Sequence, residues 1–450
     1  MKLTFKNLGK IKQTTLDLRP LTVIIGPNNT NKTYLAYCVH GVADALRDNP
    51  QYWLAPGTSK VVLKLSDVVS AIQEVVNSWT KSFARTLPEY FQDTYGGLFN
   101  DTEIRVEVDD RDVTEALARR VVERGALVLD GPRVTVYDVF RKTKKVVLDG
   151  LALEEVGHIL GTPLTLPAER NALVITYKVL SARRYRILRD IERIRKVPVS
   201  STSKAVRDRE QALLREQGDI RYPAPTEEFL DFLTDVELAP VPLNGPKSPF
   251  GRLATRIEES IQTGHRTGYE STALGGRELA LRVSDSLRID LYNASSSIKQ
   301  LAPLLLYLRY RAAPQQLLII DEPEMNLHPE GQAKLLEALA MLSNLGVHVL
   351  LTTHSPYIMT HLNNLIAADA DSQPRRKRQA THLYMGDPAA FLPPHAVSAY
   401  EMRADGLTSL ADPEYGIRWD TLSDVSAELQ QRYFSIVEEP ERRGKKRPKS

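Results

Sequence analysis

The chain has 450 residues, of which 42% are hydrophobic and 26% charged, an ordinary composition for a globular protein with a sizeable core. The net charge of +3 is too small to indicate a nucleic-acid ligand by itself, and the single cysteine excludes an intrachain disulfide and a cysteine-based zinc site. The polar N-terminus shows no signal peptide and no apolar run is long enough to span a bilayer, so we expect a cytoplasmic protein.

The N-terminal part predicts strands, a polar loop and two helices. Alternating apolar residues predict strands within the first 25 residues, the last of them being LTVII at 21–25. The loop GPNNTNKT follows at 26–33, and apolar residues at helical spacing then predict a helix over 33–48. A second amphipathic helix is expected over 60–94.

The middle of the chain mixes strand-like and basic helical patterns. Strands are expected at 102–108, 126–130 and 133–139. A helical run over 177–196 is basic, with eight Lys or Arg against two acids from position 178 onward. The segment 197–228 contains Pro and Ser and is highly charged, which predicts an exposed arm or loop.

The last part alternates strands and helices. Strands are expected at 279–283, 287–292, 317–320 and 347–353, and helices at 298–310 and 330–344. A basic break, PRRKRQ at 374–379, precedes a smaller C-terminal region whose basic tail is expected to be disordered.

The loop GPNNTNKT departs from the phosphate-binding pattern G-x-x-x-x-G-K-[ST] only at Asn31. Backbone N–H groups before a helix suit phosphate oxygens, Lys32 would reach the β- and γ-phosphates, and the Thr33 hydroxyl would bind Mg²⁺. Asn31 is tolerable because Asn adopts positive φ more readily than most residues other than Gly. The expected nucleotide-binding residues of the loop are Gly26, Pro27, Asn28, Asn29, Thr30, Asn31, Lys32 and Thr33. The alternative is a chance Lys-Thr in a polar turn.

Two later strands end in residues that suit phosphate chemistry. LLIIDEPE at 317–324 places Asp321 and Glu322 after a buried strand, where Asp321 would hold Mg²⁺ and Glu322 would polarise the attacking water. His354 ends the next strand and would approach a γ-phosphate from the same edge. An ordinary acidic turn and a structural histidine are the alternatives.

A run of small residues, NASSSIKQL at 293–301, opens a predicted helix. Its Ser295, Ser296 and Ser297 and the free N–H groups of a helix start suit an anion. Plain N-capping of the helix is the alternative interpretation.

The order of these segments resembles the ATP-binding-cassette (ABC) type of P-loop ATPase, in particular the soluble group of RecF, SMC and OLD-like ATPases. The resemblance is specific over 1–40 and 290–365. It implies an α/β ATPase head, in which mixed antiparallel and parallel sheets are flanked by helices, with an inserted helical and β region. By this resemblance the loop is the Walker A element, Asp321 and Glu322 are the Walker B pair, and His354 is the switch histidine. Asn326 and Leu327 then begin the D-loop, and the three serines form a degenerate signature.

The resemblance also implies partners and an organisation. It implies a head-to-head dimer, or a higher oligomer, that sandwiches two ATP molecules with Mg²⁺. LPAERNAL at 166–173 resembles a strand-end element of OLD-like ATPases, and a structural salt bridge is the expected role of Glu169 or Arg170. The expected parts are 1–100 and 266–370 for the ATPase head, 101–265 for the inserted region with its basic arm, and 371–450 for the C-terminal region.

The function favoured by the resemblance is that of an ATPase subunit of an anti-phage defence complex, similar to the Septu and PARIS type, working with a separately encoded nuclease. The helix over 177–196 would bind DNA or that partner, or is simply a solvated face. The chain has no room for a long coiled coil, and no C-terminal Toprim nuclease is expected. A RecF-like DNA-repair ATPase and a non-hydrolysing, nucleotide-gated scaffold remain open alternatives.

Overall fold

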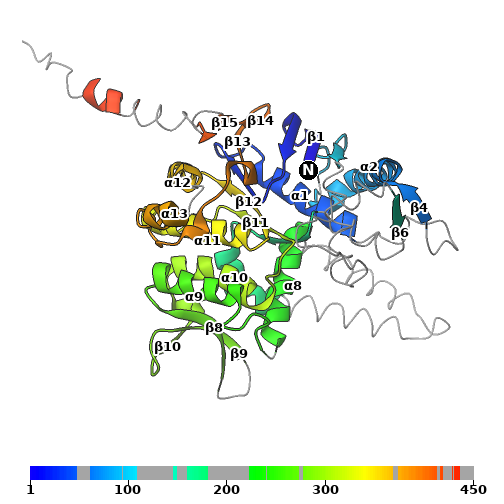
Figure 1. Ribbon diagram of the computed structural model, residues 1–450. Coiled ribbons are helices and arrows are strands. Elements are labelled where there is room, and N and C mark those ends of the chain that lie inside the picture. The colour runs from blue at the N-terminus through cyan, green and yellow to red at the C-terminus, as the bar shows by residue number, and fades with distance from the viewer. Residues whose placement is uncertain are drawn as a thin grey trace, which may run out of the picture.

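The computed structural model (Figure 1) describes residues 1–47, 61–93, 95–108, 145–148, 160–180, 222–239, 241–272, 277–367, 373–412, 416–418, 428 and 430–435. Two predicted strands, 126–130 and 133–139, lie outside these residues, as do most of the predicted basic helix and the C-terminal tail. No described helix is long and apolar enough to cross a membrane.

The main sheet has six strands in the order β14-β13-β3-β12-β11-β7. Their bounds are β3 Leu21–Ile25, β7 Thr162–Leu166, β11 Gln316–Asp321, β12 His348–Thr353, β13 Val397–Arg403 and β14 Gly406–Ser409. All neighbours are parallel except β13 and β14. The register pairs Ile25 with Thr353, and Thr352 with Asp321, so the ends of three strands from distant parts of the chain meet at one edge.

The central strands are apolar throughout because both faces of the sheet are covered. Since successive side chains point to opposite faces, Val23, Leu318 and Val349 enter one core. This core also contains residues of the helices α10 (Ser296–Tyr310) and α11 (Pro329–Asn344). Ile24 and Ile319 enter the other core, which also contains residues of α1 and of the N-terminal strands. The predicted buried strands are confirmed, and β11 and β12 lie side by side as expected.

The remaining strands form small antiparallel sheets. The sheet β2-β1-β5 consists of β1 Lys2–Leu8, β2 Ile11–Asp17 and β5 Glu103–Glu107. The sheet β10-β9-β8 consists of β8 Arg266–Ser271, β9 Arg277–Arg282 and β10 Arg288–Asp290, and lies beside α9 and α10 (Figure 1). Two-stranded pairs are β4 Val61–Lys64 with β6 Lys145–Leu148, and β15 Ala411–Asp412 with β16 Gly416–Ile417. The predicted mixture of parallel and antiparallel sheets flanked by helices is confirmed.

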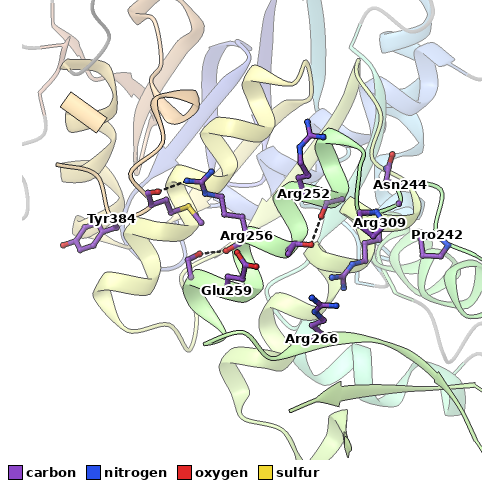
Figure 2. A pocket seen from close by; sticks show the side chains of 14 residues that line it. Pro242, Asn244, Arg252, Arg256, Glu259, Arg266, Arg309 and Tyr384 are labelled. Carbon is purple, nitrogen blue, oxygen red and sulfur yellow. Dashed lines mark hydrogen bonds between the residues drawn. The ribbon is translucent and has the colours of Figure 1, made fainter. Parts of the chain in front are cut away.

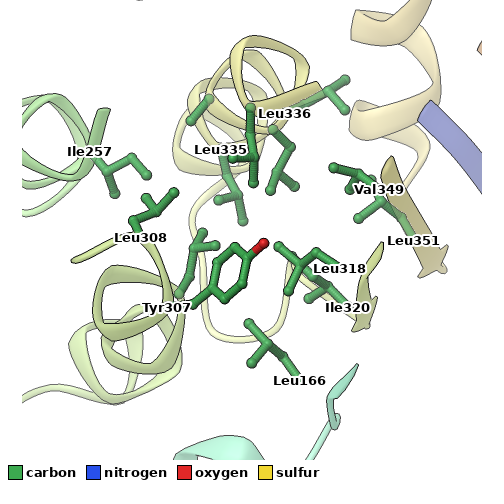
Figure 3. Close-up of a cluster of buried hydrophobic side chains, with 14 of the residues drawn as sticks. Leu166, Ile257, Tyr307, Leu308, Leu318, Ile320, Leu335, Leu336, Val349 and Leu351 are labelled. Carbon is green, nitrogen blue, oxygen red and sulfur yellow. The ribbon is translucent and has the colours of Figure 1, made fainter. Parts of the chain in front are cut away.

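The described α-helices include α1 Lys32–Arg47, α2 Leu65–Tyr90, α8 Ala224–Leu238, α9 Pro249–Ile261, α10 Ser296–Tyr310, α11 Pro329–Asn344, α12 Pro356–Ala367 and α13 Gln373–Ala380. Short 3₁₀ helices span Leu291–Asn293, Pro388–Ala390 and Pro394–Ala396. Tyr307 of α10 is fully buried among leucine side chains (Figure 3), and its hydroxyl donates to Gln316 Oε1 at 2.7 Å. This pairing satisfies the polar end of a ring that packs α10 against β11.

Three sequence predictions are wrong at this level. The expected helix over 60–94 begins as a strand, since β4 Val61–Lys64 pairs with β6 and α2 starts only at Leu65. The predicted arm over 197–228 overlaps α8, which begins at Ala224. The apolar residues of α8 pack in the core, so the segment forms a helix with one buried face although it is highly charged. The predicted break at 374–379 lies within α13; Pro374 is only the second residue of that helix, where a missing N–H breaks no intrahelical bond.

Candidate nucleotide site

The loop between β3 and α1 has the backbone form that the sequence predicts for a phosphate loop. It leaves a buried strand at Ile25 and enters a helix at Lys32. Asn31 has φ +68°, the left-handed conformation in which Asn is the best substitute for glycine, so the predicted reason for tolerating Asn31 is confirmed. Asn29 also has positive φ, at +61°. Two residues with positive φ within three positions bring consecutive backbone N–H groups together ahead of α1.

Gly26 is required by close packing. A Cβ atom on Gly26 would lie 2.5 Å from the carbonyl oxygen of Met402 in β13. The first residue of the loop therefore passes directly over a strand from the C-terminal part of the chain, and only glycine fits there.

Lys32 is buried and its ammonium group turns back onto the loop. Nζ donates to Gly26 O at 3.0 Å and to Pro27 O at 2.8 Å, and lies 3.0 Å from His354 Nε2. Burial lowers the pKa of Lys32, and the carboxylates of Glu322 and Asp321 partly oppose that shift. The ammonium group is thus held at the mouth of the loop, at the position from which it would meet phosphate oxygens.

Thr33 and Asp321 are joined by a hydrogen bond. Thr33 Oγ1 donates to Asp321 Oδ2 at 2.8 Å, and the Thr352 hydroxyl donates to the other carboxylate oxygen. Burial of Asp321 raises its pKa, and the two hydroxyl donors act in the opposite direction. The pair brings together the first helical turn after the loop and the end of β11.

A hydroxyl and a carboxylate are oxygen ligands that suit Mg²⁺, which binds few protein groups and retains waters or phosphate oxygens. No group of three or more His, Cys, Asp or Glu side chains in the described part of the chain could hold a metal ion by itself. The two residues therefore fit a metal ion that arrives with a phosphate ligand.

Glu322 and His354 face each other across the ends of β11 and β12. His354 Nε2 lies 3.3 Å from Glu322 Oε1, and each side chain is about one third exposed, at 29% and 31%. The hydrogen bond with His354 is the main cause of the lowered pKa of Glu322. Glu322 is therefore a carboxylate at neutral pH, which is the form that a general base requires.

Glu324 holds the backbone of His354. Its Oε1 accepts from His354 N at 2.6 Å and from Thr353 Oγ1 at 2.7 Å, whereas its buried Oε2 has no hydrogen-bond partner. Burial raises the pKa of Glu324. Glu324 is the third carboxylate of DEPE, and the sequence analysis gave it no role; it fixes the backbone position of His354.

The three serines sit at the start of α10, apart from the loop. Ser295 is the N-cap residue and accepts from Ile298 N at 3.4 Å, and its Oγ lies 2.9 Å from Ser297 Oγ. No hydrogen bond among the described residues joins these serines to residues 26–33. Ser295 therefore caps α10, in agreement with the alternative interpretation of this segment.

Arg170 makes contacts that differ from those expected from the sequence. The expected role of Glu169 or Arg170 was a salt bridge, but the Arg170 guanidinium donates to backbone carbonyls. Glu169 is exposed. The acceptors of Arg170 are Pro167 O, Gln300 O, Asp321 O and Glu322 O, at 2.7 to 3.2 Å. Carbonyls past the end of a strand lack partners in the sheet and must find donors elsewhere, and the sequence gives no direct sign of which donor reaches them.

A surface pocket of about 810 Å³ lies elsewhere, between α9, β8 and the segment around Tyr384 (Figure 2). It shares no lining residue with the loop, Asp321, Glu322 or His354. Of its four arginines, Arg256 donates to Asp387 and Arg309 donates to Glu258. These carboxylates offset much of the positive charge of the pocket. The candidate nucleotide site is therefore the one at the edge of the main sheet.

Comparison with known proteins supports an ATPase domain. Residues 166–360 match a family described as "AAA domain, putative AbiEii toxin, Type IV TA system". The matched region contains Arg170, the serines, Asp321, Glu322 and His354, but begins after the loop at 26–33. No curated protein matches the chain.

Two solved structures are similar at low identity. One is the Smc head domain with an extended coiled coil bound to the C-terminal domain of ScpA from Pyrococcus furiosus, at 12% identity and TM-score 0.34, covering 96% of this chain and 98% of that chain. The other is the SmcHead bound to the C-winged helix domain of ScpA, at 12% identity and TM-score 0.36, covering 92% and 98%. Both TM-scores are low, so the site geometry and the family match carry the functional argument.

Proposed function

We propose that the protein binds ATP at the carboxyl edge of the main sheet and hydrolyses it to ADP and phosphate. The hydrogen bond between Thr33 and Asp321 is the observation that carries this proposal, because it joins two segments 288 residues apart. A chance Lys-Thr in a turn gives no reason for its threonine to meet a strand-end aspartate. Similarity of residues 166–360 to an AAA-type domain supports the same class.

The binding step uses groups that are already in place. Lys32 exchanges its acceptors Gly26 O and Pro27 O for phosphate oxygens, and the N–H groups around Asn31 bind the rest of the phosphate chain. Thr33 and Asp321 would hold Mg²⁺, which neutralises phosphate charge when bound. The raised pKa of Asp321 indicates that this carboxylate is costly in the free protein and gains from a cation.

The chemical step falls to Glu322 and His354. Glu322 accepts the proton of a water that attacks the γ-phosphorus, the bond between the γ-phosphorus and the bridging oxygen breaks, and ADP leaves with that oxygen. His354 contacts Glu322 and orients its carboxylate. Serines 295–297 are exposed or half-exposed on their own subunit, which supports a role toward the nucleotide of a second copy in a head-to-head dimer.

The biological setting that we propose is an anti-phage defence complex in which a separately encoded nuclease is the effector. The description of the matched family mentions a putative AbiEii toxin of a type IV toxin–antitoxin system and motivates this setting, with a RecF-like repair ATPase as the alternative. DNA or the partner would bind at the basic segment 177–196, which lies mostly outside the described residues.

The test is phosphate release by the wild type and by Glu322→Gln, with Glu330→Gln as the matched control on the exposed start of α11. We expect Mg²⁺-dependent turnover that falls about 100- to 1,000-fold in Glu322→Gln, with unchanged ATP affinity and more ATP-bound dimer by size-exclusion chromatography. Wild type that binds ATP and dimerises without turnover, even with DNA present, would instead be a nucleotide-gated scaffold. A wild type that does not bind ATP contradicts the proposal.

A further inference from the structure

Arg170 is a buried charge placed between the catalytic edge and the start of α10. It is 2% exposed and follows β7, the strand next to β11. Burial lowers its pKa to about 10, so the guanidinium remains charged at neutral pH. Its guanidinium donates to four backbone carbonyls, which belong to Pro167, Gln300, Asp321 and Glu322.

Two of the acceptors belong to the residues proposed to do the chemistry. Arg170 Nη1 donates to Asp321 O at 2.7 Å, and Nη2 donates to Glu322 O at 3.1 Å. Glu322 has φ +48°, an uncommon conformation for a non-glycine residue that needs support from its surroundings. The direction of the Glu322 side chain depends on this backbone, and therefore on Arg170.

The other contact of interest is with α10. Arg170 Nε donates to Gln300 O at 3.2 Å. With the Gln300 amide turned so that its oxygen faces the guanidinium, Oε1 accepts from Nη1 at 3.2 Å and from Nη2 at 2.6 Å. Gln300 is 1% exposed and lies three residues after Ser297 on the same helix, about 4.5 Å along its axis.

One planar group therefore binds both the carbonyls behind Asp321 and Glu322 and the helix that begins with the three serines. The guanidinium offers donors in a rigid fork, so a shift of α10 relative to β11 cannot leave all of its hydrogen bonds intact. A lysine in its place would keep the charge but could not bind both elements in the same directions.

We propose that Arg170 is a positioning residue that couples the two nucleotide sites of the dimer. The inference rests on the proposed function, in which the serines of one subunit contact the nucleotide held by the other. A change in their position on binding passes along the first turn of α10 to Gln300, through Arg170, and to the backbone of Asp321 and Glu322 in the same subunit. Each site then responds to occupancy of the other.

The test compares Arg170→Lys and Gln300→Met with Arg311→Lys. Arg311 is the matched control because it caps the opposite end of α10 and binds Glu228 and Pro163 O, away from the catalytic edge. For the wild type and each variant we would measure ATP affinity, the dependence of phosphate release on ATP concentration, and thermal unfolding. We expect wild type to show a Hill coefficient between 1 and 2, the range open to two coupled sites.

In Arg170→Lys we expect the Hill coefficient to fall to about 1 and kcat to fall roughly tenfold, with ATP affinity within about threefold of wild type. Gln300→Met should move the Hill coefficient in the same direction, and keeps the test decisive if Arg170→Lys does not fold. Arg311→Lys should keep the wild-type values. A purely structural role would lower the unfolding temperature of Arg170→Lys without changing cooperativity.

The outcomes separate the two proposals. Cooperative wild-type turnover that persists in a folded Arg170→Lys or in Gln300→Met overturns the coupling alone, and so does wild-type turnover without cooperativity. A wild type that neither dimerises with ATP nor releases phosphate overturns the proposed function and the coupling with it.

Discussion

Lys32 and His354 are in direct contact, with Nζ 3.0 Å from Nε2, although 322 residues separate them in the chain. They meet because β3 and β12 are adjacent parallel strands. The same imidazole nitrogen lies 3.3 Å from Glu322 Oε1. It can accept from Lys32 only when it carries no proton, and it can donate to Glu322 only when it does. The presence or absence of a proton on Nε2 thus decides whether His354 hydrogen-bonds to Glu322 or to Lys32.

The left-handed conformation of Asn31 predicts a graded effect of substitution. Asn31→Ala should lower the free energy of unfolding by about 1 kcal/mol and weaken ATP binding, because alanine pays a steric cost at φ +68°. Asn31→Gly should be as stable as wild type or more so, since glycine adopts this φ freely. Urea unfolding followed by circular dichroism gives both values. Equal stability of the alanine and glycine variants would show that the conformation carries no cost.

The contact between Gly26 and β13 predicts sensitivity to a single methyl group. Gly26→Ala should lower the free energy of unfolding by about 1–3 kcal/mol, because the new Cβ would lie 2.5 Å from Met402 O and the strand would have to shift. Gly268→Ala is the matched control, since nothing lies within 4 Å of its Cβ position. Denaturant unfolding of the two variants should differ clearly, and similar curves would contradict the close packing.

Burial of Asp321 predicts a pH-dependent stability difference. A pKa raised by folding means that Asp321 favours the folded state below its unfolded pKa, about 3.9, and that this contribution is lost as pH rises through the folded value. An asparagine at this position cannot ionise, so the Asp321→Asn variant does not lose this contribution to folding stability as the pH rises. Without nucleotide it should unfold roughly 2–4 °C higher than wild type at pH 8.

The difference between Asp321→Asn and wild type should shrink as the pH falls toward 4. Thermal unfolding of both proteins across this pH range provides the measurement, and Asp285→Asn serves as a control because Asp285 is exposed in the turn between β9 and β10. A variant that is less stable than wild type at every pH would rule out desolvation as the dominant effect.

Local patterns were sufficient for the phosphate loop and the strand ends. The apolar run before Gly26, the helical spacing after Thr33 and the positive φ of Asn31 can all be inferred within about 20 residues of sequence, because each depends on local backbone preference. The meeting of Glu322 with His354 followed from the order of parallel strands, whose carboxyl ends share an edge.

Long-range pairings were beyond reach of the same reasoning. The carbonyl contacts of Arg170 depend on β7 lying beside β11, and the restriction on Gly26 depends on β13 pairing with β3. Neither strand pairing can be inferred from the spacing of apolar residues within a single strand. α13 formed across the predicted basic break, where Arg376 stacks over the Phe391 ring and gives a charged helix a contact that its own sequence does not reveal.

The central claim is that the loop at 26–33 binds ATP, and its most direct test is ATP affinity in Lys32→Ala. Titration with a fluorescent ATP analogue in the presence of Mg²⁺ would be compared for wild type, Lys32→Ala and the control Lys6→Ala, an exposed lysine of β1 paired with Glu103. We expect affinity to fall roughly 10- to 150-fold in Lys32→Ala, the loss of one charge-assisted contact, and to remain unchanged in Lys6→Ala. A folded Lys32→Ala that binds ATP as tightly as wild type would contradict the account.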